Sequence, residues 1–288
     1  MTAQAHTLNT KTLRWLITVI YVSSFSFAHS QNVESFGVFG GFNIPFTIDQ
    51  GLQKDPRYFG KATIRGTPVG LAYGYDHVGF GFLITPSYIK VGQQFTIQNV
   101  SGGEVGFRDV LMDFISVPVA LKLHINDLAF FRLSMVAALN FSYLVSGSDV
   151  ITHSASKLKY PPTVIIPNEP GYVEDYDGVF VPQINGLEYV TNDKFKPFQL
   201  FAAIGVRADI EINEDWGINI DGRANFGIFD PRKNEYTDIL QAPGDVPDLY
   251  GARREIYLGA MIGVSRLIQI KKDFKARSST STKKKKRK

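Results

Sequence analysis

The 288-residue chain contains no cysteine. It therefore has no disulfide scaffold, thiolate zinc site, thiol nucleophile or cysteine for a lipid anchor. Its five histidines include no pair at metal-ligand spacing, so neither a metal nor another cofactor is predicted. Aromatic side chains are abundant instead, with 22 Phe and 13 Tyr. Together with 44% hydrophobic and 20% charged residues, this composition excludes an intrinsically disordered chain.

Basic charge is confined to one end of the chain. Residues 271–288 contain ten Lys or Arg and one Asp, whereas residues 31–270 contain 19 basic and 26 acidic side chains, a net charge of −7. An acidic body argues against nucleic acid as a partner. We predict a periplasmic basic tail over 271–288, either solvated or bound to peptidoglycan, anionic headgroups or an acidic protein through its last six residues, Lys283, Lys284, Lys285, Lys286, Arg287 and Lys288.

The N-terminus has the pattern of an export signal. Lys11 and Arg14 precede a 13-residue apolar run, which is too short to span a bilayer but matches a signal-peptide core. Ala28 and Ser30 follow at the small-residue positions of a cleavage site. We predict a signal peptide over 1–30, with a buried N-terminal strand or helix as the alternative.

Beyond residue 31, apolar and polar residues alternate with a period of two, which is typical of strands. The run 128–145 is apolar enough for a transmembrane helix, but its polar residues fall on even positions, opposite an apolar set. A helix would place Arg132 within reach of lipid, so the strand is favoured. We predict eight strands near residues 33–45, 66–76, 78–98, 104–124, 128–145, 198–212, 216–228 and 255–265.

Short turns alternate with longer connections between these strands. Turns at 75–77, 125–127 and 213–215 separate the loops 46–65, 147–197 and 230–253, and 101–103 is one short exception. Long strands with a continuous apolar face and this alternation indicate an all-β fold, an eight-stranded antiparallel transmembrane β-barrel in a meander over 31–270. A soluble sandwich is the alternative. An even strand number predicts a bacterial outer-membrane location with both termini periplasmic and the long loops extracellular.

Three segments carry a family resemblance. They are DFISVPVALK at 113–122, FGVFGGFN at 36–43 and LAYGY at 71–75. With Pro118 and Lys122 at their motif positions, they resemble small outer-membrane β-barrels of Bacteroidetes-type bacteria, the PorT-like family. The resemblance implies an eight-stranded barrel and, from the secretion machine to which PorT belongs, a role in a protein-secretion or envelope assembly. The long loop and the lysine tail depart from that relative.

Charged side chains fall on the inward-facing parity of the predicted barrel. An eight-stranded barrel has an interior just wide enough for side chains, so these charges must be paired. The interpretation as a structural network competes with a proton or ion path. The predicted inward set is Lys122, Arg132, Arg207, Asp209, Glu211, Asp221 and Arg223.

The segment 147–197 is predicted to be a long extracellular loop. It contains seven acidic residues, four lysines and six aromatics, which favour a folded binding surface. Asn185 and Gly186 predict a tight turn of a hairpin between 179–184 and 187–190. The candidate binding residues are Tyr172, Glu174, Asp175, Tyr176 and Asp177.

The predicted role is non-enzymatic: a structural or interaction barrel of the cell envelope. The alternative is a narrow pore or transporter. A lipid-modifying enzyme is a third hypothesis, which depends on His153 with Ser154 and Ser156 near the outer rim. The predicted partners are outer-membrane lipid and envelope proteins.

Overall fold

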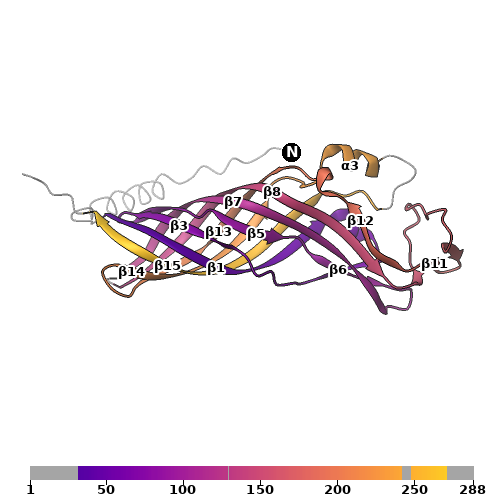
Figure 1. The fold of residues 1–288 in the computed structure, drawn as a ribbon, viewed down its shortest axis with the longest axis horizontal. Coiled ribbons are helices and arrows are strands. Elements are labelled where there is room, and N and C mark those ends of the chain that lie inside the picture. The colour runs from indigo at the N-terminus through magenta and orange to yellow at the C-terminus, as the bar shows by residue number, and fades with distance from the viewer. Residues whose placement is uncertain (1–31, 129, 242–247, 271–288) are drawn as a thin grey trace, which may run out of the picture.

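The computed structural model describes residues 32–128, 130–241 and 248–270 (Figure 1). The predicted signal peptide and basic tail lie outside the described residues. The described strands are β1 (Asn32–Asp49), β2 (Tyr58–Lys61), β3 (Val69–Asp76), β4 (Phe80–Ile84), β5 (Ser87–Val91), β6 (Gln94–Gln98), β7 (Glu104–Leu128), β8 (Phe131–His153), β9 (Ser156–Leu158), β10 (Val173–Asp175), β11 (Gly178–Val181), β12 (Ile184–Val190), β13 (Phe198–Glu211), β14 (Trp216–Gly227) and β15 (Arg253–Ile270). The helices are α2 (Gln50–Lys54), α3 (Asn234–Gln241) and the 3₁₀ turn η2 (Asn192–Lys194).

The antiparallel pairings close into a barrel. The ring runs through β1, β3, β4, β7, β8, β13, β14 and β15, and β15 pairs with β1 along its whole length. When the short strands between them are left aside, strands that are consecutive in the sequence are also neighbours in the ring, as in a meander. Closure leaves no unpaired edge around the ring, which is how a sheet satisfies its backbone groups in lipid.

The sheet differs in detail from the eight uninterrupted strands that the sequence predicts. The run 78–98 is divided into β4, β5 and β6. The short β2 pairs with β6 and the short β12 pairs with β8, so the sheet has twelve strands among the described residues. Pro86 follows β4 and has no N–H to donate to a ladder, and Gly92 after β5 takes a φ of +102°. The prediction of an all-β barrel is confirmed, with this interrupted wall as the difference.

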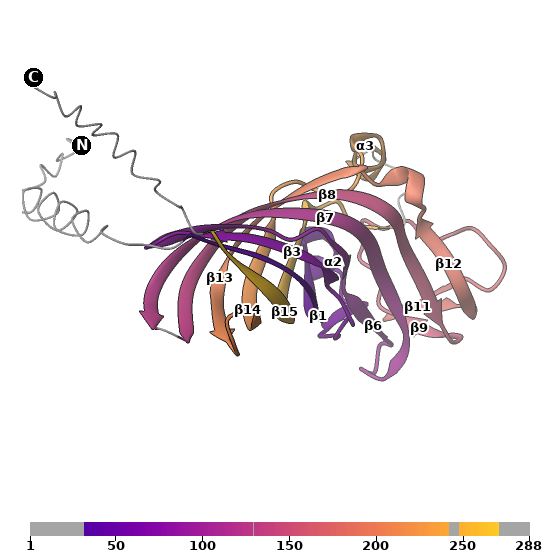
Figure 2. The ribbon, with the colours of Figure 1, turned by 60° about the vertical axis from the view of Figure 1, so that its left-hand side comes forward.

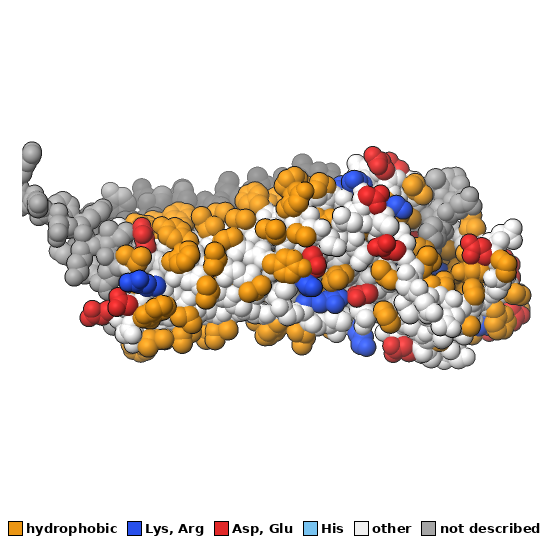
Figure 3. Space-filling view, in the orientation of Figure 1, with side chains coloured by type: hydrophobic (Ala, Val, Ile, Leu, Met, Phe, Trp, Pro, Cys, Tyr) orange, Lys and Arg blue, Asp and Glu red, His pale blue; other side chains and the backbone are white. Residues whose placement is uncertain are grey.

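The barrel is apolar outside and polar inside. On β8, Met135, Leu139 and Phe141 are exposed, whereas Asn140 and Ser142 are buried in the lumen. On the face in Figure 3, hydrophobic side chains cover the barrel wall, and charged ones gather at its left end and in the right half. This arrangement is that of a barrel surrounded by lipid. In the part of the chain that the structure describes, no helix is long and apolar enough to cross a membrane.

The two ends of the barrel are unlike. We call the turn end the one at which β3 is followed by β4, β7 by β8 and β13 by β14, and the loop end the opposite one, with 50–68, 99–103, 154–197 and 228–241. β7 and β8 run on to the loop end, where β9, β10 and β11 form a separate three-stranded sheet (Figures 1 and 2). A cluster of buried apolar side chains, including Ile97, Val110 and Phe114, fills this half of the interior.

The hairpin predicted around Asn185 and Gly186 is wrong. Both residues lie within β12, which pairs with β8 through a register shift, and β11 pairs with β10 and β9 instead. Gly186 takes a φ of +68° at this shift and donates its N–H to Thr152 Oγ1 at 3.1 Å. The Asn–Gly pair therefore serves a bulge, where the same left-handed conformation is required as in a tight turn.

Candidate functional site

An alternating chain of charges crosses the lumen in its turn-end half. Lys122 Nζ lies 2.7 Å from Asp76 and 3.4 Å from Asp209. Arg207 joins Asp209 at 2.8 Å to Asp221 at 3.4 Å, and Arg223 Nε donates to the same Asp221 at 2.8 Å. The chain links β3, β7, β13 and β14, because inward-facing side chains from different strands meet within the narrow interior.

The remaining predicted lumen residues lie nearer the turn end. Arg132 contacts Asp127 at 3.0 Å and Asp76 at 3.5 Å, and Glu211 is exposed at the end of β13. Asp76 is not among the predicted lumen residues, because the sequence pattern assigned Asp76 to a turn. Its parity with the buried Ala72 is the signal that could have placed Asp76 inside the barrel.

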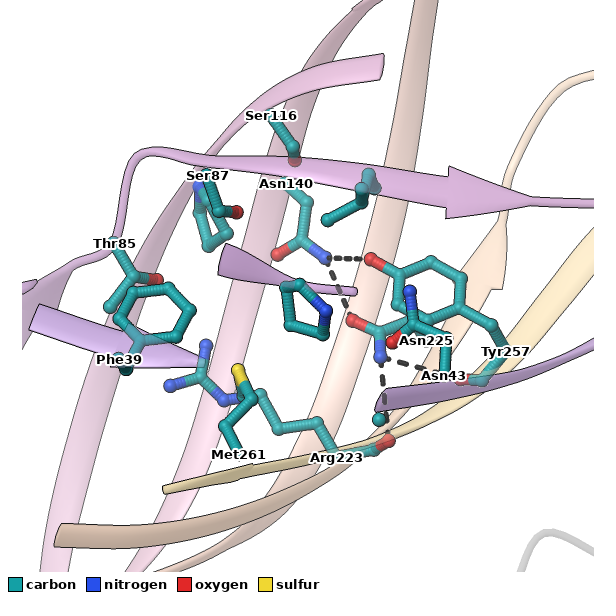
Figure 4. A pocket seen from close by; sticks show the side chains of 14 residues that line it. Phe39, Asn43, Thr85, Ser87, Ser116, Asn140, Arg223, Asn225, Tyr257 and Met261 are labelled. Carbon is teal, nitrogen blue, oxygen red and sulfur yellow. Dashed lines mark hydrogen bonds between the residues drawn. The ribbon is translucent and has the colours of Figure 1, made fainter. Parts of the chain in front are cut away.

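The middle of the lumen is occupied by amide and aromatic side chains. Asn140 Nδ2 donates to Asn225 Oδ1 at 2.8 Å, and Tyr257 packs edge-on against Phe201. Figure 4 shows Asn140, Asn225 and Tyr257 close together on one side of a small cavity that Arg223 also lines. The cavity has a volume of about 20 Å³, room for about one water molecule.

A second cluster of charges closes the loop end. Arg108 is fully buried and donates from two nitrogens to Asp149, both at 2.7 Å, and from two to Asp248, at 2.8 and 2.7 Å. Arg253 Nε donates to Asp49 at 2.7 Å. Asp248 precedes β15 in the connection that carries α3, so its pairing with Arg108 fastens that connection to the barrel mouth. We call these five residues the loop-end latch.

At Asp248 in the loop-end latch, the nearby arginines together have a larger effect on the pKa than burial has. Burial disfavours the charged form of Asp248, but the Arg108 guanidinium holds the pKa of this carboxyl below its usual value. Arg57 extends the arrangement, since its guanidinium pairs with Asp55 and lies 4.2 Å from the Tyr160 ring centroid. The segment after β9 is thereby held against the barrel mouth.

Sequence reasoning missed the latch. Arg108 lies within the predicted strand 104–124 but was not among the predicted inward charges, Asp149 was assigned to the loop 147–197, and Arg253 precedes the predicted last strand. The signal was the continued parity, because Arg108 alternates in step with the buried Val110 and Met112.

The loop-end sheet bears a groove. This groove, of about 680 Å³, is bounded by the β10–β11 hairpin on one side and by the segment 159–166 on the other. Of the predicted binding residues, Glu174, Asp175, Tyr176 and Asp177 line it, and Tyr172 packs beside the apolar cluster. The Tyr176 side chain is fully exposed, at 101%.

A lysine organises the carboxylates of the groove. Lys157 Nζ lies 2.5 Å from Asp175 Oδ2 and also pairs with Asp177, and Tyr176 N donates to Asp175 Oδ1 at 2.8 Å. The hydrogen bonds from Lys157 and from the Tyr176 amide lower the pKa of Asp175. The hydrogen bonds that Lys157 donates to Asp175 and Asp177 raise the pKa of Lys157. Both groups therefore stay charged over a wide pH range.

The histidine proposed for an enzyme site is built into the wall. His153 is buried at the end of β8, and its Nδ1 lies 3.0 Å from Ser154 O. Among the described residues, no carboxylate makes an ion pair with this ring, whereas a triad requires an acidic group to orient it.

Fold and surface together define an outer-membrane β-barrel protein, closed, antiparallel, apolar outside and polar within. Residues 19–231, about three quarters of the chain, match the model of the outer membrane protein beta-barrel domain family, and the chain belongs to that family. No curated protein matches this sequence.

The solved structures to which this chain is similar are distant. OprG from Pseudomonas aeruginosa is 10% identical, with a TM-score of 0.42, over 83% of this chain and 97% of OprG. Ail from Yersinia pestis is 9% identical, with a TM-score of 0.32, over 84% of this chain and 100% of Ail. The protease OmpT from Escherichia coli is 9% identical, with a TM-score of 0.33, over 84% of this chain and 96% of OmpT.

Proposed function

We propose that this protein is a non-conducting, non-enzymatic barrel that holds an interaction surface outside the cell. The observation that carries the proposal is the filled interior, in which ion pairs occupy both halves of the lumen and amides and aromatic rings lie between them. Moving a solute through would separate buried charge pairs, and an unpaired buried charge costs about 3–5 kcal/mol. The groove at the loop end is left as the place for a partner.

The orientation and setting belong to the same proposal. Export by the predicted signal peptide leaves the short turns and both termini in the periplasm and the groove at the cell surface. The resemblance to PorT-like barrels of Bacteroidetes-type bacteria supports a place in a secretion or envelope assembly. The predicted basic tail, Lys283 to Lys288, would reach a periplasmic partner or the cell wall.

Planar-bilayer recording tests the closed lumen. We expect no conductance steps from purified protein whose insertion is verified by flotation with liposomes. The variants Arg207→Ala and Asp221→Asn test the alternative of a narrow pore or transporter. A steady wild-type conductance that changes in either variant would overturn the proposal and favour the pore.

Co-purification tests the assembly role. Tagged protein is extracted from its native envelope in mild detergent, as the full chain and as a chain ending at Phe274. A defined partner set that depends on the tail supports periplasmic docking, and one retained without the tail supports docking elsewhere. Empty eluates from both chains contradict the assembly role and leave a self-contained barrel.

A further inference from the structure

The groove at the loop end is a preformed site with two kinds of wall. One wall is the β10–β11 hairpin, with Tyr176 at its tip and Gly178 and Val179 at the start of β11. The other contains Tyr160, two prolines and Ile165. A volume of about 680 Å³ lies within the range of sites that hold small organic ligands.

The hairpin tip presents a stacking surface beside fixed acceptors. Tyr176 is fully exposed, so its aromatic face is free for a ligand. Asp175 and Asp177, on either side of it, are held by Lys157, and Asp175 is also fixed by the Tyr176 amide. A carboxylate oxygen carries two lone pairs, so each carboxylate retains acceptor capacity for hydroxyl groups.

The charged side chains around the groove limit the kind of ligand that it can bind. Three carboxylates line the groove, Glu174, Asp175 and Asp177, and Lys159 also lines it, while Lys157 pairs with Asp175 and Asp177. With charge this nearly balanced, a polyanion or a polycation gains little attraction. A neutral ligand with vicinal hydroxyls and a flat C–H face uses both the paired carboxylates and the tyrosine ring.

We propose that this groove binds a neutral saccharide. The inference rests on the proposed function, in which the loop end is the interaction surface. One face of a sugar ring stacks on Tyr176, and adjacent hydroxyls donate to Asp175 and Asp177. Lys157 keeps the two carboxylates in position, because it bonds to both and leaves each with lone pairs that can accept further hydrogen bonds.

Binding is tested with full-length protein in a zwitterionic detergent without sugar headgroups. The probes are immobilised neutral oligosaccharides, from mammalian surfaces and from bacterial polysaccharides in separate arms, with sulfated and sialylated glycans and polylysine for comparison. We expect retention by neutral oligosaccharides in one arm, which identifies the source, and competition by a maltoside detergent. Retention by the charged probes alone, or equally by all probes, would overturn the proposal.

Variants at the tip separate recognition from folding. Tyr176→Ala is expected to weaken saccharide binding about tenfold, whereas Tyr176→Phe retains the ring and the affinity. Tyr250→Ala removes another exposed tyrosine and serves as the control. Equal affinity of Tyr176→Ala and wild type would also overturn the proposal. A silent bilayer with no saccharide retained refutes this inference alone, whereas a conducting lumen refutes the proposed function.

Discussion

Arg253 and Arg254 are adjacent in β15, yet their surroundings are opposite. Arg253 is 1% exposed and contacts Asp49 and Asp149, whereas Arg254 points to the exposed outer face. The period of two in a strand causes this difference. The two positions therefore form a matched pair for measuring what a buried charge contributes.

Arg253→Met is expected to lower the free energy of unfolding by about 3–5 kcal/mol, because it leaves Asp49 and Asp149 buried with fewer partners. Arg254→Met, the control, is expected to change it by no more than about 0.5 kcal/mol. Urea titration of the refolded protein in detergent micelles measures both. Equal effects of the two variants would show that the loop-end latch does not stabilise the fold.

Asp248 gives the latch a dependence on pH. Its pKa is lower in the folded protein, so its stabilising contribution is present above the usual aspartate pKa of about 3.9 and is lost as pH falls through the lowered value. We expect wild type to exceed Asp248→Asn in unfolding free energy at pH 7, and the difference to shrink towards pH 3. Asp238→Asn, at an exposed site on α3, is the control. A difference that is constant with pH would contradict the ion pair with Arg108.

At the scale of elements, β12 depends both on the backbone conformation of Gly186 and on its pairing with β8. An added Cβ at Gly186 would meet no atom within 4 Å, so the only constraint there is the positive φ. The strand pairs with β8 alone, through a shifted register. Its stability thus depends on a backbone conformation that few residues adopt.

Gly186→Val is expected to cost about 1–2 kcal/mol, because a β-branched residue resists a left-handed conformation. Gly186→Asn should be nearly neutral, since asparagine tolerates this conformation. Hydrogen exchange over 184–190, read by mass spectrometry, should report faster opening in the valine variant only. The same rate in all three proteins would mean that the bulge is absent in solution.

At the scale of the whole molecule, the barrel separates a membrane-facing wall from two unlike ends. The absence of cysteine makes the orientation of these ends directly measurable, because any introduced thiol is unique. Asn185 lies at the loop end and Asn213 in a connection at the turn end.

A membrane-impermeant maleimide on intact cells is expected to label Asn185→Cys and to leave Asn213→Cys unlabelled until the outer membrane is permeabilised. The proposed orientation requires this because only the loop end then faces outwards. Labelling of Asn213→Cys alone on intact cells would invert the topology. The unsubstituted protein, which has no thiol, provides the blank.

The alternation of residue types determined most of the barrel before any tertiary information. Strand positions, the outward apolar set and the inward lumen charges follow from a period that is local to each strand. From Asp113 to Lys122, for example, the alternation can be recognised in that segment alone, and the same alternation is present in β7. The folded structure adds which inward residues meet, because register and stagger between strands lie outside any single segment.

Three features were decided only by the tertiary structure. Asp76 joins Lys122 because β3 and β7 lie on either side of β4, where both residues are in register with Gly81, and Asp248 joins Arg108 across 140 positions of sequence. Asn185 and Gly186 form a bulge because β8 offers a partner strand. Local sequence determines which face a side chain takes, whereas contacts between distant segments depend on the closure of the whole ring.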